Sequence, residues 1–228
     1  MGSAINKQEW NTIAARYASP VAGPGKPDGL CYPLLPVDLR GKRILDAGCG
    51  TGWLTRHLAR QGATVVGIDI SDGLIARAQA AEAAAPLGIT YRVHDLMEEL
   101  PFDEGTFDIA ISVWTIMDVE EPLAAIRNIG RTVRIGGQFV CSLVHPCFYR
   151  QKISAGGTEL DLDNYFDRQR IEWRHIEARD GSGTHIQYRQ FHRTVGDYLN
   201  TLAECGFCLL RFVESNGTTE LAISCHKH

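Results

Sequence analysis

The stretch that decides the fold is Leu45-Asp46-Ala47-Gly48-Cys49-Gly50-Thr51-Gly52, which follows directly on Arg43 and Ile44. Glycines at alternate positions let the backbone turn sharply and let a ligand approach it closely. The spacing is not the Gly-x-Gly-x-x-Gly of dinucleotide-binding folds, because Trp53 takes the last place, and the Gly-Lys-Ser/Thr of a phosphate loop is missing. The stretch therefore predicts a strand, a glycine turn and a helix that need not hold a pyrophosphate.

Short apolar runs and helical stretches alternate on both sides of this turn. The runs predict strands over 43–47, 64–70, 89–93, 107–113, 138–144, 207–213 and 220–225. The stretches between and before them predict helices over 7–17, 54–61, 73–85, 121–132 and 194–205. Such alternation predicts an α/β fold, a mostly parallel Rossmann-like sheet with helices on both faces.

The alternation breaks between residues 150 and 195, where charged and aromatic residues are interleaved. Residues 171–176 and 185–191 alternate enough to predict a hairpin, turned at Asp180-Gly181-Ser182-Gly183. We expect one domain over 1–228, with an N-terminal lid segment (1–40) and a small antiparallel or loop cap (150–195). A cap inserted after the fifth strand is placed to cover a cleft at the carboxyl ends of the strands.

Composition excludes several classes of protein. The chain has 228 residues, 44% hydrophobic and 22% charged, which is typical of a globular protein and not of a disordered one. A net charge of −4 disfavours a nucleic-acid partner. No run approaches the ~20 apolar residues of a membrane span, and residues 1–10 lack the apolar core of a signal peptide. We therefore expect a cytoplasmic protein with no nucleic-acid or membrane partner.

The seven cysteines are an odd number, and most lie among apolar neighbours, as reduced core cysteines do. Only Cys205-Gly-Phe-Cys208 has a metal-type spacing, and no second Cys-x-x-Cys accompanies it. Two cysteines at a helix end and in the following strand explain the same pattern. We expect no metal.

Carboxylates stand at three successive strand ends: Asp46, Asp69 and Asp95. Asp69 is placed to accept hydrogen bonds from ribose hydroxyls. The alternative for Asp69 is to cap the next helix, a role that Ser71 or Asp72 can fill instead. Three anions beside a glycine loop would repel a phosphate, so the pattern suits a cationic nucleoside without phosphate.

Five ordered motifs make the chain resemble a class I S-adenosylmethionine-dependent methyltransferase of the small-molecule type. They are Leu45–Gly52, Val66-Gly67-Ile68-Asp69-Ile70-Ser71, His94-Asp95-Leu96 with Leu100-Pro101-Phe102, Phe107-Asp108-Ile109-Ala110-Ile111-Ser112, and Arg134-Ile135-Gly136-Gly137-Gln138-Phe139. The match covers about residues 40 to 147 and resumes from about 194. The resemblance implies a seven-stranded sheet whose last strand is antiparallel and lies beside the fifth.

The resemblance also implies a cofactor, S-adenosylmethionine, with S-adenosylhomocysteine as its product. Asp69 would hold the ribose hydroxyls, Asp95 the adenine amino group, and Asp46 would lie near the methionine amino group. The full set of cofactor-binding residues that it implies is Tyr17, Asp46, Gly48, Gly50, Asp69, Ile70, Asp95, Leu96 and Ser112.

Two histidines are candidates for a base that takes a proton from the methyl acceptor, because histidine titrates near neutral pH. His145 lies at the end of the fifth strand, and His192 lies where the cap rejoins the sheet. The alternative is that each holds the cap through a backbone carbonyl. Many relatives carry a histidine pair after strand four, where this chain has Thr115-Ile116-Met117-Asp118-Val119, and we expect Asp118 to be a surface or hinge residue.

The aromatic and basic residues near these positions are candidates for the acceptor pocket: Trp114, Tyr149, Tyr165 and Arg193. An aromatic roof without a binding role is the alternative for the tyrosines, and core packing is the alternative for Trp114.

The predicted function is methyl transfer to an oxygen or nitrogen of a small acceptor, aromatic or a secondary metabolite. The sequence has Ser112-Val113-Trp114-Thr115 where enzymes that methylate exocyclic amino groups have Asn/Asp-Pro-Pro-Tyr. Carbon methylation, a cofactor-dependent step such as cyclisation, and a cofactor-binding partner subunit are the alternatives. We expect a monomer or a homodimer.

Overall fold

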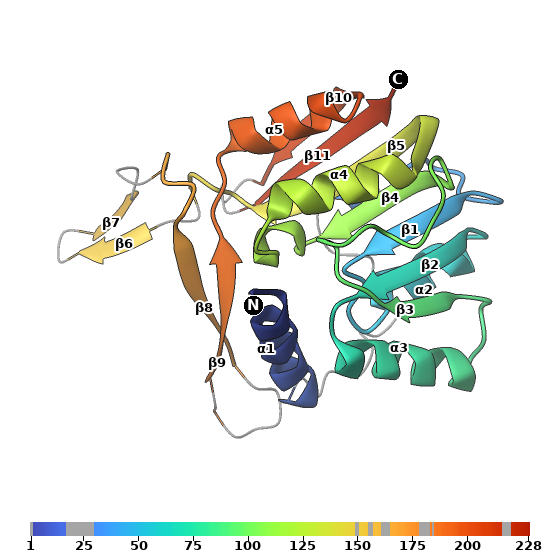
Figure 1. The fold of residues 1–228 in the computed structure, drawn as a ribbon, viewed down its shortest axis with the longest axis horizontal. Coiled ribbons are helices and arrows are strands. Elements are labelled where there is room, and N and C mark those ends of the chain that lie inside the picture. Colours follow the sequence, from blue (N-terminus) through green and yellow to red (C-terminus); the bar gives the residue numbers. More distant parts are fainter. Residues whose placement is uncertain are drawn as a thin grey trace.

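The structure is a computed structural model in which an open, twisted sheet carries helices on both faces (Figure 1). It describes residues 2–16, 30–148, 151–154, 157–160, 165–177, 183, 185–215 and 220–228. The predicted site residues Tyr17 and Tyr149 lie outside these ranges.

The central sheet has seven strands in the order β10-β11-β5-β4-β1-β2-β3. Its members are β1 (Arg43–Ala47), β2 (Thr64–Asp69), β3 (Thr90–Val93), β4 (Phe107–Val113), β5 (Val133–Val144), β10 (Phe207–Glu214) and β11 (Glu220–Lys227). β1 to β5 pair in parallel, and β11 pairs antiparallel with β5. The predicted fold class and the antiparallel last strand beside the fifth are confirmed.

Alternate side chains of each inner strand enter two separate cores, as the two-residue period of a strand requires. On β1, Leu45 packs in the core under α4 (Pro122–Thr132) and α5 (Val195–Glu204), while Ile44 packs in the core under α2 (Trp53–Arg60). Figure 1 shows α4 and α5 side by side on one face of the sheet. Burial of both faces explains why these strands are continuous apolar runs in the sequence.

Two further helical segments bring residues to the carboxyl edge of the sheet. Helix α3 (Asp72–Ala84) packs along β2 and β3, and the short helix η2 (Ile116–Asp118) follows β4. A second short helix, η1 (Tyr32–Leu34), precedes β1. Ser71 caps α3 by accepting a hydrogen bond from Leu74 N, so the capping role that competed with ligand binding at Asp69 belongs to Ser71.

The segment between β5 and α5 forms two small antiparallel sheets, β6 (Gln151–Ser154) with β7 (Gly157–Leu160), and β8 (Ile171–Glu177) with β9 (His185–Phe191). The predicted hairpin is the second pair, and the first was not predicted. Helix α1 (Gly2–Arg16) lies between β9 and α3 (Figure 1), and Trp10 packs on Tyr188 at 5.3 Å between ring centroids. The Arg189–Glu9 ion pair, 2.8 Å, fastens the helix to the hairpin.

The fifth strand departs from its predicted bounds. It begins at Val133 and not at residue 138, and its register with β4 shifts between Phe107 and Ile109. Gly136 has a φ of 72°, so the longer strand contains an irregularity at its glycines. No helix in the described ranges is both long and apolar enough to span a membrane.

Candidate active site

The glycine loop after β1 is held against β2 by its own backbone. The N–H groups of Gly48 and Cys49 both donate to the Ile68 carbonyl, at 2.8 and 3.0 Å. Gly50 has a φ of 56°, a conformation that favours glycine, and a Cβ built on it would meet no atom within 4 Å. The loop therefore presents bare backbone to open space at this point.

Asp69, the last residue of β2, joins the loop to the next helix. Its Oδ2 accepts from Gly50 N and its Oδ1 from Ser71 N, both at 2.9 Å. Burial raises the pKa of this carboxyl, and the backbone N–H groups oppose that shift. A carboxylate has about four lone-pair positions, so Asp69 keeps acceptor capacity for a diol.

A cleft with an empty volume of about 560 Å³ opens in front of the loop. Its lining includes seven of the residues that the sequence predicts for the site: Gly48, Gly50, Asp69, Ile70, Asp95, Leu96 and Trp114. Helix α1 closes it with Asn6 and Trp10. The described lining contains no Lys or Arg, so its charge suits a nucleoside without phosphate.

The polar atoms of this cleft test whether S-adenosylmethionine fits. Asn6 Oδ1 is buried with no hydrogen-bond partner among the described residues, while its Nδ2 donates to the Asp118 carbonyl at 2.8 Å. Asp95 accepts from Met97 N at 2.9 Å and faces the same cleft. These acceptors lie among apolar side chains such as Ile70 and Leu96. A lining with acceptors and no Lys or Arg fits a nucleoside that carries hydroxyl and amino groups.

Asp46 and Ser112 lie behind the cleft and do not line it. Asp46 is 2% exposed and accepts from Thr55 Oγ1 at 2.6 Å. Burial raises its pKa to about 7, with the Asp69 charge adding to the rise and the Thr55 hydroxyl opposing it. Ser112 Oγ donates to the Ala47 carbonyl at 2.8 Å, so both side chains fix the strand ends that carry the loop.

A second, larger cavity continues from the cleft, with an empty volume of about 1570 Å³ that opens to solvent. Five residues line both spaces: Trp10, Gly50, Leu74, Trp114 and Asp118. Hairpin β8–β9 contributes Tyr188 and Gln190 to the larger cavity, and β11 contributes Glu220. None of these last three residues was predicted, because only the tertiary fold brings the hairpin and the start of β11 beside the glycine loop.

Trp114 stands at the junction of the two spaces in a strained conformation. Its φ is 51°, the one positive value among the described non-glycine residues, and its side chain is 46% exposed. A bulky residue in this region costs of the order of 1–3 kcal/mol and persists where the surroundings hold it. The hydrogen bond from Trp114 N to the Ser142 carbonyl, 3.1 Å, helps to hold it.

The expectation that Asp118 is a surface or hinge residue is wrong. Asp118 is 4% exposed and lines both the cleft and the larger cavity. Gln190 Nε2 donates to its Oδ1 at 2.9 Å, and burial raises the pKa of the carboxyl well above its usual range. Its burial depends on α1 and β9, which pack over η2 from distant parts of the sequence.

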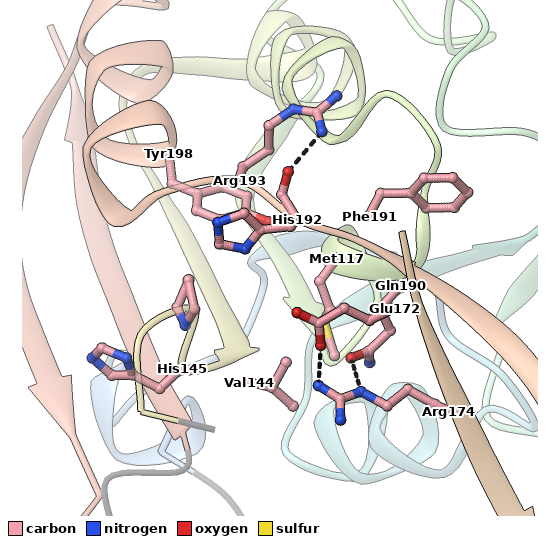
Figure 2. A pocket seen from close by; sticks show the side chains of 11 residues that line it. Met117, Val144, His145, Glu172, Arg174, Gln190, Phe191, His192, Arg193 and Tyr198 are labelled. Atoms are coloured by element: carbon pink, nitrogen blue, oxygen red, sulfur yellow. Dashed lines mark hydrogen bonds and ion pairs between the residues drawn. The ribbon is translucent and has the colours of Figure 1, made fainter. Parts of the chain in front are cut away.

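The two candidate bases, His145 and His192, lie together on a third and smaller cavity (Figure 2). His145 Nδ1 accepts from the backbone N–H groups of Cys147 and Phe148, at 3.1 and 3.2 Å, and Nε2 lies 2.8 Å from Glu214 Oε1. Those two donors leave the ring proton on Nε2, so no ring lone pair of His145 is available to an acceptor molecule.

His192 Nε2 lies 2.6 Å from the Tyr165 carbonyl, so this histidine ties the end of β9 to the cap. The Tyr165 hydroxyl accepts a hydrogen bond from Val195 N. Tyr165 does not line the cleft, the larger cavity or the small cavity that holds the histidines. Arg193 lines the small cavity with the histidines and donates to the Arg168 carbonyl at 2.7 Å. The structure therefore places the two histidines and Arg193 beside the larger cavity and not on it.

The cysteine pair of the sequence lies at the end of α5 and on β10, with Cys205 half-buried and Cys208 exposed. No group of three or more potential metal ligands occurs within the part of the chain that the structure describes.

Comparisons with known proteins all point to methyltransferases. A methyltransferase-domain model matches residues 45–141. The ubiquinone biosynthesis O-methyltransferase of Coxiella burnetii is 32% identical over 164 residues, which cover 68% of this chain and 69% of that protein. The enzyme of the same name from Pseudomonas syringae is 36% identical over 112 residues, covering 48% of this chain and 47% of its own length.

Solved structures agree with the sequence relatives. An S-adenosylmethionine-dependent methyltransferase from Mesorhizobium loti superposes with a TM-score of 0.68 at 28% identity, over 86% of this chain and 94% of that one. The CcbJ methyltransferase from Streptomyces caelestis shares the fold at 16% identity, with a TM-score of 0.75 over 97% and 98% of the two chains. The chain belongs to the class I S-adenosylmethionine-dependent methyltransferases, the family that its glycine loop and strand-end acids resemble.

Proposed function

We propose that the protein transfers a methyl group from S-adenosylmethionine to an oxygen or nitrogen of a small acceptor with an aromatic or otherwise planar body. The observation that carries this proposal is the continuity of two spaces. A cleft of nucleoside character, bounded by Gly50 and Asp69, opens into a cavity lined by aromatic side chains. The names of the sequence relatives, which are small-molecule O-methyltransferases, support the same class of acceptor.

In this proposal the cleft binds the cofactor through the strand-end groups. Asp69 accepts from the ribose hydroxyls, Asp95 and the Leu96 backbone meet the adenine edge, and Ile70 packs on the ring. Gly48 and Gly50 leave room for the methionine part, and Asp46, fixed behind the loop by Thr55, supplies a negative potential to its amino group. The bound cofactor supplies an electrophilic methyl group on a sulfonium.

The chain's own part in the reaction is to align the acceptor and exclude water, which is the main requirement of an in-line displacement. Helix α1 and hairpin β8–β9 are fastened together by the Glu9–Arg189 ion pair and by the packing of Trp10 on Tyr188. They line the acceptor cavity from the side opposite the sheet, so we propose that they act as lid and cap. The role of His145 and His192 as bases stays a prediction.

The test is a product screen by mass spectrometry. The protein and S-adenosylmethionine are incubated with sets of phenols, aryl amines, indoles and aryl carboxylic acids, and both S-adenosylhomocysteine and an added CH₂ are measured. We expect acceptor-dependent formation of both products. Formation of neither, with S-adenosylmethionine bound, would contradict methyl transfer and favour a non-methylating use of the cofactor.

A further inference from the structure

The acceptor cavity combines aromatic faces with negative charge. Its aromatic lining comes from α1, η1, α2, the β4 end and β9: Trp10, Tyr32, Trp53, Trp114 and Tyr188. The acidic residues of the described lining are Asp118 and Glu220, and this lining contains no Lys, Arg or His. Rings with electron-rich faces beside carboxylates attract organic cations.

We propose that the methyl acceptor is a small organic cation, an amine that enters protonated and is methylated on nitrogen. This inference rests on the proposed methyl transfer and names its substrate class. A carboxylate or phosphate ester would meet two acids and no described base in this cavity, so it would bind poorly.

Glu220 supplies the first anchor. Glu220 is the first residue of β11 and pairs with Val144 of β5. Both residues line the cavity. Its carboxylate has no hydrogen-bond or ion-pair partner among the described residues, although the residue is half-buried. Burial raises its pKa, and a cation placed beside it would restore the lost solvation.

Asp118 supplies the second anchor, at the place where the methyl group must pass. Of the five residues that line both spaces, it is the ionisable one. Gln190 Nε2 donates to Oδ1, and the nearby Arg174 charge opposes the rise in pKa that burial causes. Because a transferred methyl group must cross this junction, the reacting atom of the acceptor lies within reach of Asp118.

The step balances with Asp118 as the proton acceptor. A cation beside Asp118 favours the ionised form that burial disfavours. The ammonium group gives one N–H proton to this carboxylate, which leaves a lone pair on nitrogen. That pair forms the N–C bond as the C–S bond breaks, and its electrons remain on sulfur. The positive charge of the sulfonium passes to the methylated nitrogen, and the proton leaves Asp118 for solvent. Gln190 orients the carboxylate, and Arg174 in turn donates to Gln190 Oε1 at 2.8 Å (Figure 2).

The binding test uses three probes of matched size and different charge: 2-phenylethylamine, 2-phenylethanol and phenylacetate. Each is titrated into the full chain with saturating S-adenosylhomocysteine, and affinity is followed by calorimetry. We expect the ammonium to bind at least about tenfold more tightly than the alcohol. The Glu220→Gln variant should remove most of this preference, and Glu204→Gln, on the exposed face of α5, should keep it.

Equal or tighter binding of the alcohol or of phenylacetate would overturn the inference, as would an unchanged preference in Glu220→Gln. S-adenosylhomocysteine binding is measured in the same samples. Its absence would refute the proposed function and this inference together, whereas its presence without cation preference refutes this inference alone.

The reaction test uses the amine that the wild-type protein methylates in the product screen. Asp118→Asn keeps an oxygen for the Gln190 hydrogen bond but cannot take a proton. We expect kcat to fall by about 100-fold near neutral pH and to recover above the pKa of the free amine, where no proton has to be removed. A fall that is the same at every pH would contradict the proton-acceptor role, and methylation of phenols but no amine would overturn the substrate class.

Discussion

Asp69 Oδ2 accepts a hydrogen bond of 2.9 Å from the backbone N–H of Gly50, so the acid that ends β2 and the glycine loop that follows β1 form one rigid unit. Its other oxygen accepts from Ser71 N at the start of α3. One buried carboxylate thus positions two turns and still offers lone pairs to the cleft.

Replacing Asp69 with alanine should weaken S-adenosylhomocysteine binding by at least about tenfold, because hydrogen bonds to a charged group contribute ~1.5–3 kcal/mol each. Isothermal titration measures the effect. Asp103→Asn is the control, because this exposed carboxylate lies outside the cleft, and it should bind like wild type. Unchanged binding in Asp69→Ala would remove the ribose assignment.

Replacing Trp114 with glycine should lower the rate of methyl transfer and leave the free energy of unfolding nearly unchanged. Glycine accepts the observed φ of 51° without strain, so the free energy of unfolding should stay within about 1 kcal/mol of wild type despite the lost side chain. Methyl transfer should fall, because the junction between the two spaces loses a wall. Trp173→Ala, an exposed residue of β8, should keep its activity. A large loss of stability with normal turnover in Trp114→Gly would show that the residue serves packing alone.

Replacing His145 with alanine should lower the free energy of unfolding by about 2 kcal/mol, because two backbone N–H groups after β5 lose their acceptor. Urea denaturation measures the change, with His228→Ala at the exposed chain end as the control. S-adenosylhomocysteine binding should persist. Full stability with lost turnover would instead support the prediction that His145 is a base.

The stability of the protein should depend on Asp46 between about pH 4 and about pH 7. Its pKa is about 7 in the folded protein, against an ordinary value of 3.8. Between these values the folded state holds a proton that the unfolded state has released, so the free energy of unfolding falls as pH rises. For this group alone the fall is up to roughly 4 kcal/mol.

Asp46→Asn keeps an acceptor for Thr55 and removes the titration. Urea unfolding at about pH 5 and about pH 8 should therefore show a smaller pH-dependent loss in the variant than in wild type. A variant that loses as much stability as wild type over this interval would mean that Asp46 does not titrate there.

Local sequence predicted the sheet well, and seven of the predicted site residues line one cleft, for a physical reason. Parallel strands end at one edge, so acids at successive strand ends, such as Asp69 and Asp95, must come together there. The glycine loop follows β1 at this same edge, and Asp69 at the end of β2 accepts a hydrogen bond from it. The resemblance implied seven strands with the last one antiparallel beside the fifth, and this arrangement is confirmed.

The larger cavity was much less predictable, because segments that are distant in the sequence form it. Asp118 meets Gln190, 72 residues away, and Asn6, 112 residues away. Neither contact has a local pattern, so a buried carboxylate was mistaken for a surface residue. Glu220 was missed for the same reason: it begins an ordinary strand, and only the register with β5 carries it to the cavity.

A crystal structure of the protein with S-adenosylhomocysteine tests the central claim most directly. The account predicts the ribose hydroxyls within hydrogen-bond distance of Asp69, the adenine amino group at Asp95, and the sulfur beside the junction formed by Trp114 and Asp118. A nucleoside bound elsewhere, or bound in this cleft with its sulfur turned away from that junction, would contradict it.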